Sequence, residues 1–340
     1  MPNVHAEELE HLIRKVLEGV GASAPEAATV ARHMVGANLA GHDSHGVQLL
    51  PGYVANVRRG HTVPGAPFEI LEESPATARV DGHWGFGQVV SERAMELAIV
   101  KARVSNVAAL TVRRQAHVGR VADYPLMAAR AGLIGIMCCD SGRTAKQVVP
   151  FGGREPRLGT NPLCIALPSD LEGPVFLDMA TSQAAGNKIA VYRKRGQSLP
   201  PGWIVDAAGR PSTDPADFFA GGAILPLGGA QGHKGYGLSF MVEVFAGILT
   251  GLGFGVDPSG RHNDGALMLV LNVAAFRPPA EFRAEVTAFA RYVKETPPAP
   301  GTAEVLYPGE LEWRTEQERR QDGIPVEDET WEAVTQLLTS

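Results

Sequence analysis

The fold class follows from a stretch near the middle of the chain, Val107-Ala108-Ala109-Leu110-Thr111-Val112, together with residues 124–131 and 134–138. An uninterrupted run of apolar and β-branched residues is typical of a strand that is buried on both faces. Residues 124–131 have the apolar spacing of a helix, and residues 134–138 form a second apolar run. A strand, a helix and a strand in succession indicate an α/β protein.

The same alternation extends in both directions from this stretch. Further strands are expected at residues 68–71, 76–80, 163–167, 175–177 and 267–273, and helices at 89–103 and 241–250. The dipeptide Asp81-Gly82 predicts a hairpin turn after the second of these strands. We therefore expect residues 71–280 to form one α/β domain.

The two ends of the chain have the pattern of helices. Residues 7–18 place leucine, isoleucine and valine on one face, and Ser23 with Glu26 forms a capping box at the start of a helix that ends near Leu39. From Ala280 onward the pattern returns to helix, loop and helix. We therefore expect residues 1–70 and 281–340 to form a mainly helical lobe beside the α/β domain of residues 71–280.

The composition bounds the class of protein. The chain has 340 residues, 44% of them hydrophobic, and a formal net charge of −6, so it can bury a core and is not expected to bind nucleic acid or an anionic membrane. The N-terminus lacks the basic and apolar order of a signal peptide, and no run reaches the ~18 apolar residues of a membrane span. Cys138, Cys139 and Cys164 do not make a disulfide framework. We expect a cytoplasmic protein.

Two glycine-rich stretches imitate a dinucleotide-binding turn. Residues 19–24, Gly-Val-Gly-Ala-Ser-Ala, fit the spacing G-x-G-x-x-[GA], but that fingerprint follows a strand and this stretch follows a helix. Residues 251–255 also follow a helix. A nucleotide, if one binds, is therefore not bound by the standard Rossmann turn.

The loop Gly41-His42-Asp43-Ser44-His45-Gly46-Val47 places two imidazoles, a carboxylate and a hydroxyl between glycines. A histidine in such a loop could exchange a proton near neutral pH, because its free pKa is about 6.5. Asp43 or Ser44 could equally cap the following helix. From this segment alone, a catalytic role and a helix-capping role are equally supported.

Four further polar stretches interrupt the α/β region, each with glycine and a reactive group. They are residues 113–119 with His117, residues 151–162, residues 178–182 with Asp178, and residues 231–237 with Lys234. Ligands bind at strand ends in α/β proteins, a carboxylate can orient an imidazole, and lysine with glycine at a helix N-terminus suits an anion. Each stretch alone has a purely structural explanation, but five such loops on one chain favour a ligand site.

The order and spacing of these loops resemble the type-2 malate/L-lactate dehydrogenase family, which includes sulfolactate, ureidoglycolate and diketogulonate oxidoreductases and cyclic imino-acid reductases. The matching stretches are Asp43–Val47, Leu50–Tyr53, His117–Gly119, Pro150–Gly153, Leu158–Pro162, Leu177–Ser182, Gly232–Leu238, Tyr307–Glu310 and Gly323–Val326. The resemblance implies an α/β fold with a non-Rossmann, mixed-sheet cofactor domain of the L-sulfolactate dehydrogenase type. It also implies that the helical lobe carries the His45 loop, and that the protein is a homodimer with the active site near its interface.

The activity implied by the resemblance is that of an NAD(P)-dependent dehydrogenase. Hydride would pass between the nicotinamide and a 2-hydroxy or 2-oxo acid, or less often a carbon–nitrogen double bond. His45 would be the acid/base, Asp178 would orient it, and His117 would lie at the substrate. The residues implied for NAD or NADP are Ser141, Asp178, Met179, Ala180, Lys234, Gly235, Pro308, Gly309 and Glu310. Those implied for the substrate are Ser44, Leu49, Tyr53 and Arg143, and no metal is implied.

The chain departs from the family at one position that concerns the substrate. The family usually reads Ser-His-Gly-Val-x-Arg-Leu-Pro, and this chain has Leu49 where an arginine would bind the substrate carboxylate. Leucine cannot form the paired hydrogen bonds of a guanidinium. Either Arg114, Arg120 or Arg143 supplies the charge from another loop, or the substrate is not a simple 2-oxo acid. From the sequence we favour a changed substrate.

Two other functions compete with the dehydrogenase. A metal-dependent hydrolase would use His42, Asp43, His45, His117 and His233 as ligands, although no known metal-ligand spacing is present. A catalytically altered, cofactor-binding relative is the second, and the retention of His45 and Lys234 argues against it. The sequence does not decide between NAD and NADP, the substrate or the direction of reaction.

Overall fold

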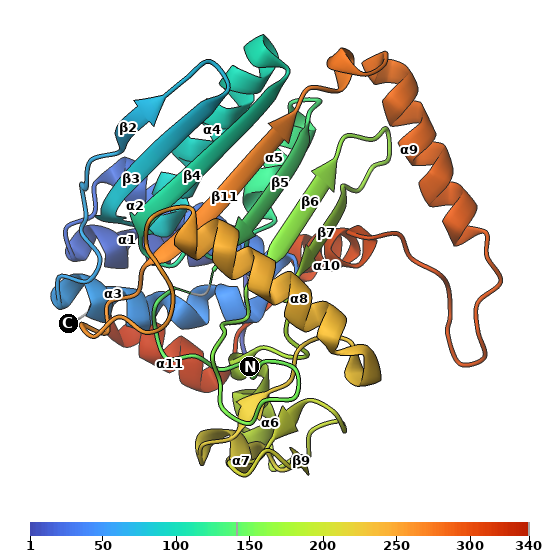
Figure 1. The fold of residues 1–340 in the computed structure, drawn as a ribbon. Helices are drawn as coiled ribbons and strands as arrows, with labels where there is room; N and C mark the ends of the chain where they lie inside the picture. Colours follow the sequence, from blue (N-terminus) through green and yellow to red (C-terminus); the bar gives the residue numbers. More distant parts are fainter. Residues whose placement is uncertain (141, 339–340) are drawn as a thin grey trace.

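The computed structural model describes residues 1–140 and 142–338, and its centre is a seven-stranded sheet in the order β2-β3-β4-β11-β5-β6-β7 (Figure 1). Strands β3 and β4 are parallel, and the other neighbouring pairs of this sheet are antiparallel. The sheet is therefore mixed and differs from the parallel sheet of a Rossmann domain. Its strands are β2 (Glu69–Glu73), β3 (Thr77–Gly85), β4 (Val107–Gln115), β5 (Ile134–Cys139), β6 (Leu163–Leu167), β7 (Val175–Met179) and β11 (Asp264–Leu271).

Helices cover both faces of this sheet. Helix α4 (Gly87–Ser105) connects β3 to β4 and, with α5 (Asp123–Arg130), packs on one face through the main hydrophobic core. Helix α8 (His233–Val242) continues into a π-helical segment, η4 (Glu243–Ile248), which packs against β5 and β11. Leu267 of β11 contacts η4 whereas its neighbour Met268 lies in the main core, so η4 covers the opposite face.

The hairpin predicted at Asp81-Gly82 is wrong. Strand β3 continues to Gly85 and pairs with β4, with a register shift between Asp81 and Gly85. The buried Asp81 carboxylate accepts hydrogen bonds from Arg113 at 3.0 Å and Arg114 at 2.8 Å on β4. Because these partners come from a neighbouring strand, a dipeptide that is typical of turns is accommodated within a strand.

The two ends of the chain meet in a separate helical core. Strand β1 (Asn3–Val4) pairs with β12 (Ile324–Pro325), and buried side chains from both ends form one cluster. The predicted capping box is present, because the Ser23 side chain accepts from the Glu26 amide and the Glu26 carboxylate accepts from the Ser23 amide. The helices of this core are α1 (Ala6–Gly19), α2 (Ala24–Leu39), α3 (Leu50–Arg58) and α11 (Asp328–Gln336).

Two other parts of the chain lie outside these cores. Helix α9 (Pro279–Lys294) extends beyond the β7 edge of the sheet, whereas α10 (Glu310–Asp322) returns to α2 (Figure 1). A small unit packs around Ile189 and Ile204, and its elements are α6 (Gly186–Lys194), β8 (Ile204–Val205), β9 (Pro211–Ser212), α7 (Pro215–Phe219) and β10 (Ala223–Ile224).

The division into residues 1–70 with 281–340 and residues 71–280 stays a prediction. In the described part of the chain, no helix combines the length and apolarity that a membrane span requires.

Candidate active site

His45 lies in a short 3-10 turn, η1 (Asp43–His45), that is held by both ends of the chain. Asn38 of α2 donates to Asp43 at 2.6 Å, and Arg319 of α10 donates to both Asp43 oxygens at 2.7 and 3.1 Å. A Cβ atom at Gly46 would lie 2.1 Å from the Asn38 side chain, so glycine is required for this close approach. The turn that presents His45 is therefore firmly positioned.

His117, in the loop after β4, stacks on His45. The ring centroids are 5.8 Å apart, and the ring planes differ by 20°. The Gly119 amide donates to Nδ1 of His117 at 3.2 Å, which leaves the proton of the neutral ring on Nε2. Tyr53 of α3 bonds the same Nδ1 at 2.8 Å, and Gln88 of α4 donates to the Tyr53 hydroxyl at 2.8 Å. The histidine pair is thus fixed from the helical core and from the sheet.

Both imidazoles of this pair are neutral at neutral pH. Burial, followed by the charges of His117 and His42, lowers the pKa of His45 to about 3. Burial lowers the pKa of His117 to about 4. Ser44 Oγ lies 2.9 Å from His45 Nδ1, so one ring nitrogen of His45 has a partner. A neutral imidazole is the form that can accept a proton from a substrate.

A cavity of about 400 Å³ opens beside the two histidines. This volume is in the usual range for a small-molecule site. Four of the five loops singled out in the sequence contribute to its wall, and the loop with Lys234 does not. The wall includes His42, Ser44, His45, residues 117–121, Gly159, Thr160, residues 178–180, Asp140, His262 and Asp264.

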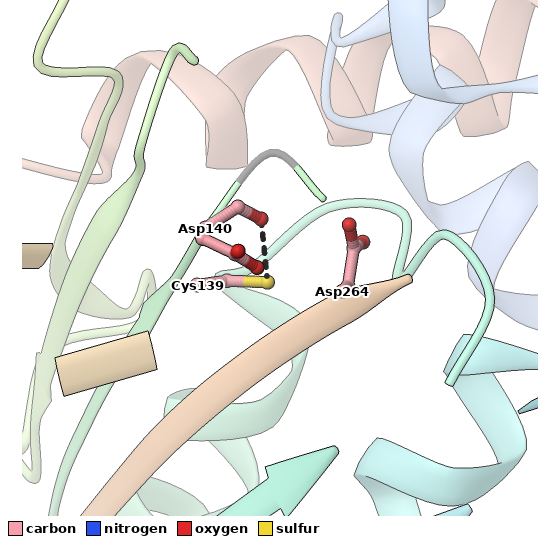
Figure 2. Close-up of side chains that lie close together, drawn as sticks. All are labelled: Cys139, Asp140 and Asp264. Atoms are coloured by element: carbon pink, nitrogen blue, oxygen red, sulfur yellow. Dashed lines mark hydrogen bonds between the residues drawn. The ribbon is translucent and has the colours of Figure 1, made fainter. Parts of the chain in front are cut away.

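A buried acidic group at the ends of β5 and β11 forms one side of the cavity (Figure 2). Asp140 Oδ1 accepts from the Gly265 amide at 2.6 Å, and its Oδ2 has no hydrogen-bond partner among the described residues. Asp264 accepts from the Val118 amide at 3.1 Å and lies 2.5 Å from Nε2 of His262. Burial and the Asp264 charge raise the pKa of Asp140 to about 7.

Sequence reasoning missed these three residues. Two local signals could have found them, since ligand groups gather at strand ends: the polar stretch Arg261-His262-Asn263-Asp264 directly before an apolar strand, and Asp140 directly after another. His262 lies beside the two carboxylates of this group. Burial lowers its pKa, but the Asp264 and Asp140 carboxylates outweigh that effect, and the net pKa is raised.

The histidines of the metal-hydrolase hypothesis do not gather as ligands. Among the described residues, the group with ligand atoms within 4.8 Å of one another is Cys139, Asp140 and Asp264, and it contains no histidine. The Cys139 thiol donates to the Asp140 main-chain oxygen at 3.3 Å (Figure 2), and burial raises its pKa well above the usual value. A protonated thiol is a poor metal ligand.

The cavity suits a cofactor that is held by several loops. Asp178, Met179 and Ala180 at the end of β7 line it, and Asp178 Oδ2 accepts from the Ala122 amide at 3.0 Å. Burial raises the pKa of Asp178. Gly186 also lines the cavity, and a Cβ atom there would lie 2.5 Å from Gln147 Oε1. Glycine at position 186 therefore allows the main chain to approach the Gln147 side chain closely at this wall.

The other residues expected at the cofactor lie elsewhere. Ser141 is outside the described residues. Lys234 and Gly235 are in the first turn of α8, where Lys234 is exposed. In the turn Pro308–Glu310, the main-chain oxygen of Pro308 accepts from Phe176 of β7, and Glu310 pairs with Lys294 and Arg314. Among the described residues that line the cavity, none comes from α8 or from this turn.

Of the residues expected at the substrate, two lie at or directly behind the cavity and two lie away from it. Ser44 lines the cavity, and Tyr53 is buried behind it against His117. Leu49, in the turn η2 (Val47–Leu49), packs against the helical core. Arg143 donates to the main-chain oxygens of Leu252 and Val256. Neither Leu49 nor Arg143 is among the described residues lining the cavity.

Comparison with known proteins agrees with this architecture. The family model described as malate/L-lactate dehydrogenase matches residues 4–335. A malate dehydrogenase of Pyrococcus abyssi is 37% identical over 94% of this chain and 90% of its own, and a ureidoglycolate dehydrogenase (NAD+) of Escherichia coli is 36% identical over 97% and 94%. The solved structure of sulfolactate dehydrogenase from Methanocaldococcus jannaschii superposes with a TM-score of 0.90 at 34% identity, over 99% of this chain and 97% of its own. The chain belongs to the malate/L-lactate dehydrogenase family.

The main predictions from the sequence are thereby confirmed. The family, the non-Rossmann α/β fold and an NAD(P)-dependent dehydrogenase acting on hydroxy acids all agree with the relatives and their structures. The roles of individual residues, the division into domains and the dimer stay predictions.

Proposed function

We propose that this protein interconverts a 2-hydroxy acid and its 2-oxo acid with NAD or NADP, and that His45 exchanges the proton with the substrate oxygen. The observation that carries the proposal is the stacked pair of His45 and His117 in the wall of a cavity built by several glycine-containing loops. Family membership supports the reaction class. A positioned imidazole beside such a cavity can act as a general acid/base, and its neutral form is the one that accepts a proton from an alcohol.

The proton step follows from the hydrogen bonds of His45. Nδ1 is engaged by Ser44, so Nε2 is the nitrogen left for the substrate. When the alcohol is oxidised, Nε2 accepts the hydroxyl proton, and in the reverse direction the protonated ring returns it. The bound nicotinamide supplies or receives the hydride. Because the pKa of His45 is about 3, the free enzyme keeps the base form throughout the neutral range.

The neighbouring residues bind and orient. His117 keeps its proton on Nε2 and is assigned as a donor to the substrate oxygen, with Tyr53 and Gln88 fixing its orientation. Asp178, Met179 and Ala180 are assigned to the nicotinamide end of the cofactor, since they line the cavity. Lys234, Gly235, Ser141 and the turn Pro308–Glu310 are assigned to the remainder of the dinucleotide by the family resemblance.

The substitution His45→Ala tests the proposal. General acid/base groups typically contribute about 100- to 10,000-fold to turnover, so kcat should fall by at least 100-fold. NADH affinity, measured by fluorescence titration, should stay within about threefold, because the substitution leaves the Asp178 side of the cavity intact. The matched control is His11→Ala, an exposed histidine of α1. Full turnover of a 2-oxo acid by His45→Ala would overturn the role of His45.

We further propose that the protein is a homodimer with the active site near its interface. The side chains Phe240, Met241, Phe245, Ile248 and Leu249 are between 42% and 58% exposed. Their spacing places them on one face of the continuous helix formed by α8 and η4, and such apolar patches mark interfaces. The η4 segment packs on β5 and β11, whose ends carry the acidic side of the cavity. Light scattering that gave a monomer mass would contradict this assignment.

A cytoplasmic location is also proposed. It is supported by the three cysteines, which are all buried free thiols. Stable free thiols are typical of proteins that work in a reducing compartment. Fractionation of cells that express the protein, with the family's activity followed in each fraction, tests the location.

A further inference from the structure

Arg120 places a buried guanidinium in the wall of the cavity with part of its hydrogen-bonding capacity unused. The residue is 8% exposed and lies three positions after His117. One terminal nitrogen donates to Asp123 at 3.3 Å, and the Nε atom is buried with no hydrogen-bond partner among the described residues. A buried donor without an acceptor is costly, which marks this guanidinium as a group with unused hydrogen-bonding capacity.

The charge of Arg120 ends a chain of alternating charges that runs from the surface to the cavity. Arg32 pairs with Glu92, Glu92 with His33 at 2.8 Å, His33 with Asp123 at 2.9 Å, and Asp123 with Arg120. Asp123 and Glu92 outweigh the effect of burial and raise the pKa of His33 to about 9, so this histidine is a cation. Three cations and two carboxylates leave one positive charge in excess, and the cavity end of the chain is Arg120.

The surroundings hold this guanidinium in place without neutralising it. The Phe176 ring lies under it at 5.3 Å from the ring centroid, which fixes the plane of the guanidinium. Among the described residues, Asp123 is the carboxylate within 4.0 Å of Arg120, and it is shared with His33. Asp178 also lines the cavity and feels the Arg120 charge, but burial outweighs that effect and raises the pKa of Asp178. Arg120 therefore presents an oriented cation to whatever occupies the cavity.

The other two arginines considered from the sequence are engaged elsewhere. Arg114 donates to the buried Asp81 at 2.8 Å, and Arg143 bonds main-chain oxygens of the loop after η4. Neither is among the described residues that line the cavity. A guanidinium can pair through two of its N–H groups with the two oxygens of a carboxylate.

We propose that Arg120 binds the carboxylate of the substrate and so selects 2-oxo and 2-hydroxy acids over neutral ketones and alcohols. The assignment rests on the proposed function, because it places the carboxylate in the same cavity as His45. It also favours the first explanation for Leu49, in which another loop supplies the charge, over a changed substrate. The competing occupant of an arginine site in this enzyme is a phosphate of the dinucleotide.

The test compares the full-length protein with Arg120→Met, Arg120→Lys and the control Arg103→Met, an exposed arginine of α4. The readouts are KM for a panel of 2-oxo acids and for their carboxamides, NADH affinity by fluorescence, and affinity for oxamate, an unreactive analogue of a 2-oxo acid. Thermal unfolding checks that each variant is folded.

The proposal expects Arg120→Met to raise KM for the acids, and to weaken oxamate binding, by about 100-fold or more. Values for the carboxamides and for NADH should stay within about threefold. Arg120→Lys should recover part of the loss, because it keeps the charge without the paired donors. Weaker NADH binding with unchanged oxamate binding would assign Arg120 to the phosphates and overturn the proposal, as would no change in either.

The design separates this inference from the proposed function. Oxamate binding does not require turnover, so a loss of oxamate affinity in Arg120→Met supports the anion site even if no carbonyl substrate oxidises NADH. Absence of NADH and NADPH oxidation by the wild-type protein across the whole panel would instead count against the dehydrogenase. Normal turnover with unchanged oxamate affinity in the variant would leave the dehydrogenase standing and remove Arg120 from substrate binding.

Discussion

Two histidines placed before and after the end of α2 show opposite electrostatic behaviour. His33 is 8% exposed and hydrogen-bonded to two carboxylates, and its pKa rises to about 9. His45 faces a hydroxyl and two other histidines, and its pKa falls to about 3. Burial disfavours the charged form of both rings, so the difference comes from their partners.

The contrast separates a structural role from a chemical one. His33 joins α2 to α4 and α5 through Glu92 and Asp123, and it stacks on Tyr124 with 5.3 Å between centroids. Its charge is therefore part of the contact of α2 with α4 and α5. His45 is kept neutral and available at a cavity, which is the state that proton exchange needs. The same residue type joins helices in one place and, in the proposed function, exchanges a proton in the other.

The largest expected effect is the loss of stability when His33, the charged histidine of this comparison, is replaced. His33→Gln should lower the free energy of unfolding by about 3–5 kcal/mol, since it removes the cation that Glu92 and Asp123 share. Denaturant unfolding measures the loss, and kcat of the folded variant should change little. The matched control His11→Gln, on the exposed face of α1, should leave the stability unchanged.

The sign of the pH dependence follows from the raised pKa of His33. The folded pKa of about 9 exceeds the usual histidine value of 6.5, so the stabilisation is complete below pH 6.5 and is lost as the pH rises to 9. The loss across this window is about 3 kcal/mol, at ~1.4 kcal/mol per pKa unit. His33→Gln should lack that part of the slope. An equal slope in both proteins would contradict the paired state of His33.

The second prediction extends the comparison to a carboxylate without a cationic partner. The pKa of Asp140 is raised from 3.8 to about 7, so the folded state keeps a proton that the unfolded state releases. Stability should therefore fall as the pH rises from about 4 to 7 and level off above it, by up to about 4 kcal/mol. Asp140→Asn should remove this fall and be more stable than the wild type at pH 8. A steeper fall in the variant would show that Asp140 is ionised and paired.

The smallest expected effect is on kcat, and it tests the hydrogen bond that positions His45, the neutral histidine of this comparison. Ser44 Oγ is the hydrogen-bond partner of Nδ1, so Ser44→Ala should loosen the ring and lower kcat by about tenfold, or ~1.4 kcal/mol. Ser44→Thr, which keeps the hydroxyl, should recover most of the activity. Steady-state kinetics with a 2-oxo acid and NADH measures both. Equal losses in the two variants would point to packing in the turn instead of the hydrogen bond.

Local patterns were sufficient for much of the fold and part of the site. The buried strands, the capping box at Ser23 and the loops with His45, His117 and Asp178 are each marked by a few neighbouring residues. Asp140, His262 and Asp264 were missed as a group because they are brought together by β5 and β11, two strands that are far apart in the sequence. The turn predicted at Asp81-Gly82 failed for the same reason, since its partners Arg113 and Arg114 lie on another strand.

The sequence by itself determined the class of fold, the family and the candidate site loops, because strand and helix periodicity, caps and the order of motifs can be read directly along the chain. Tertiary structure decided the charge states and the positions of the arginines. His33 and His45 are equivalent as residues, and only the groups packed around them make one a cation and the other neutral. Likewise, Arg114, Arg120 and Arg143 were equal candidates until folding buried Arg120 in the cavity wall and paired the other two elsewhere. Electrostatic free energies depend on distances between residues remote in the chain, which no local pattern encodes.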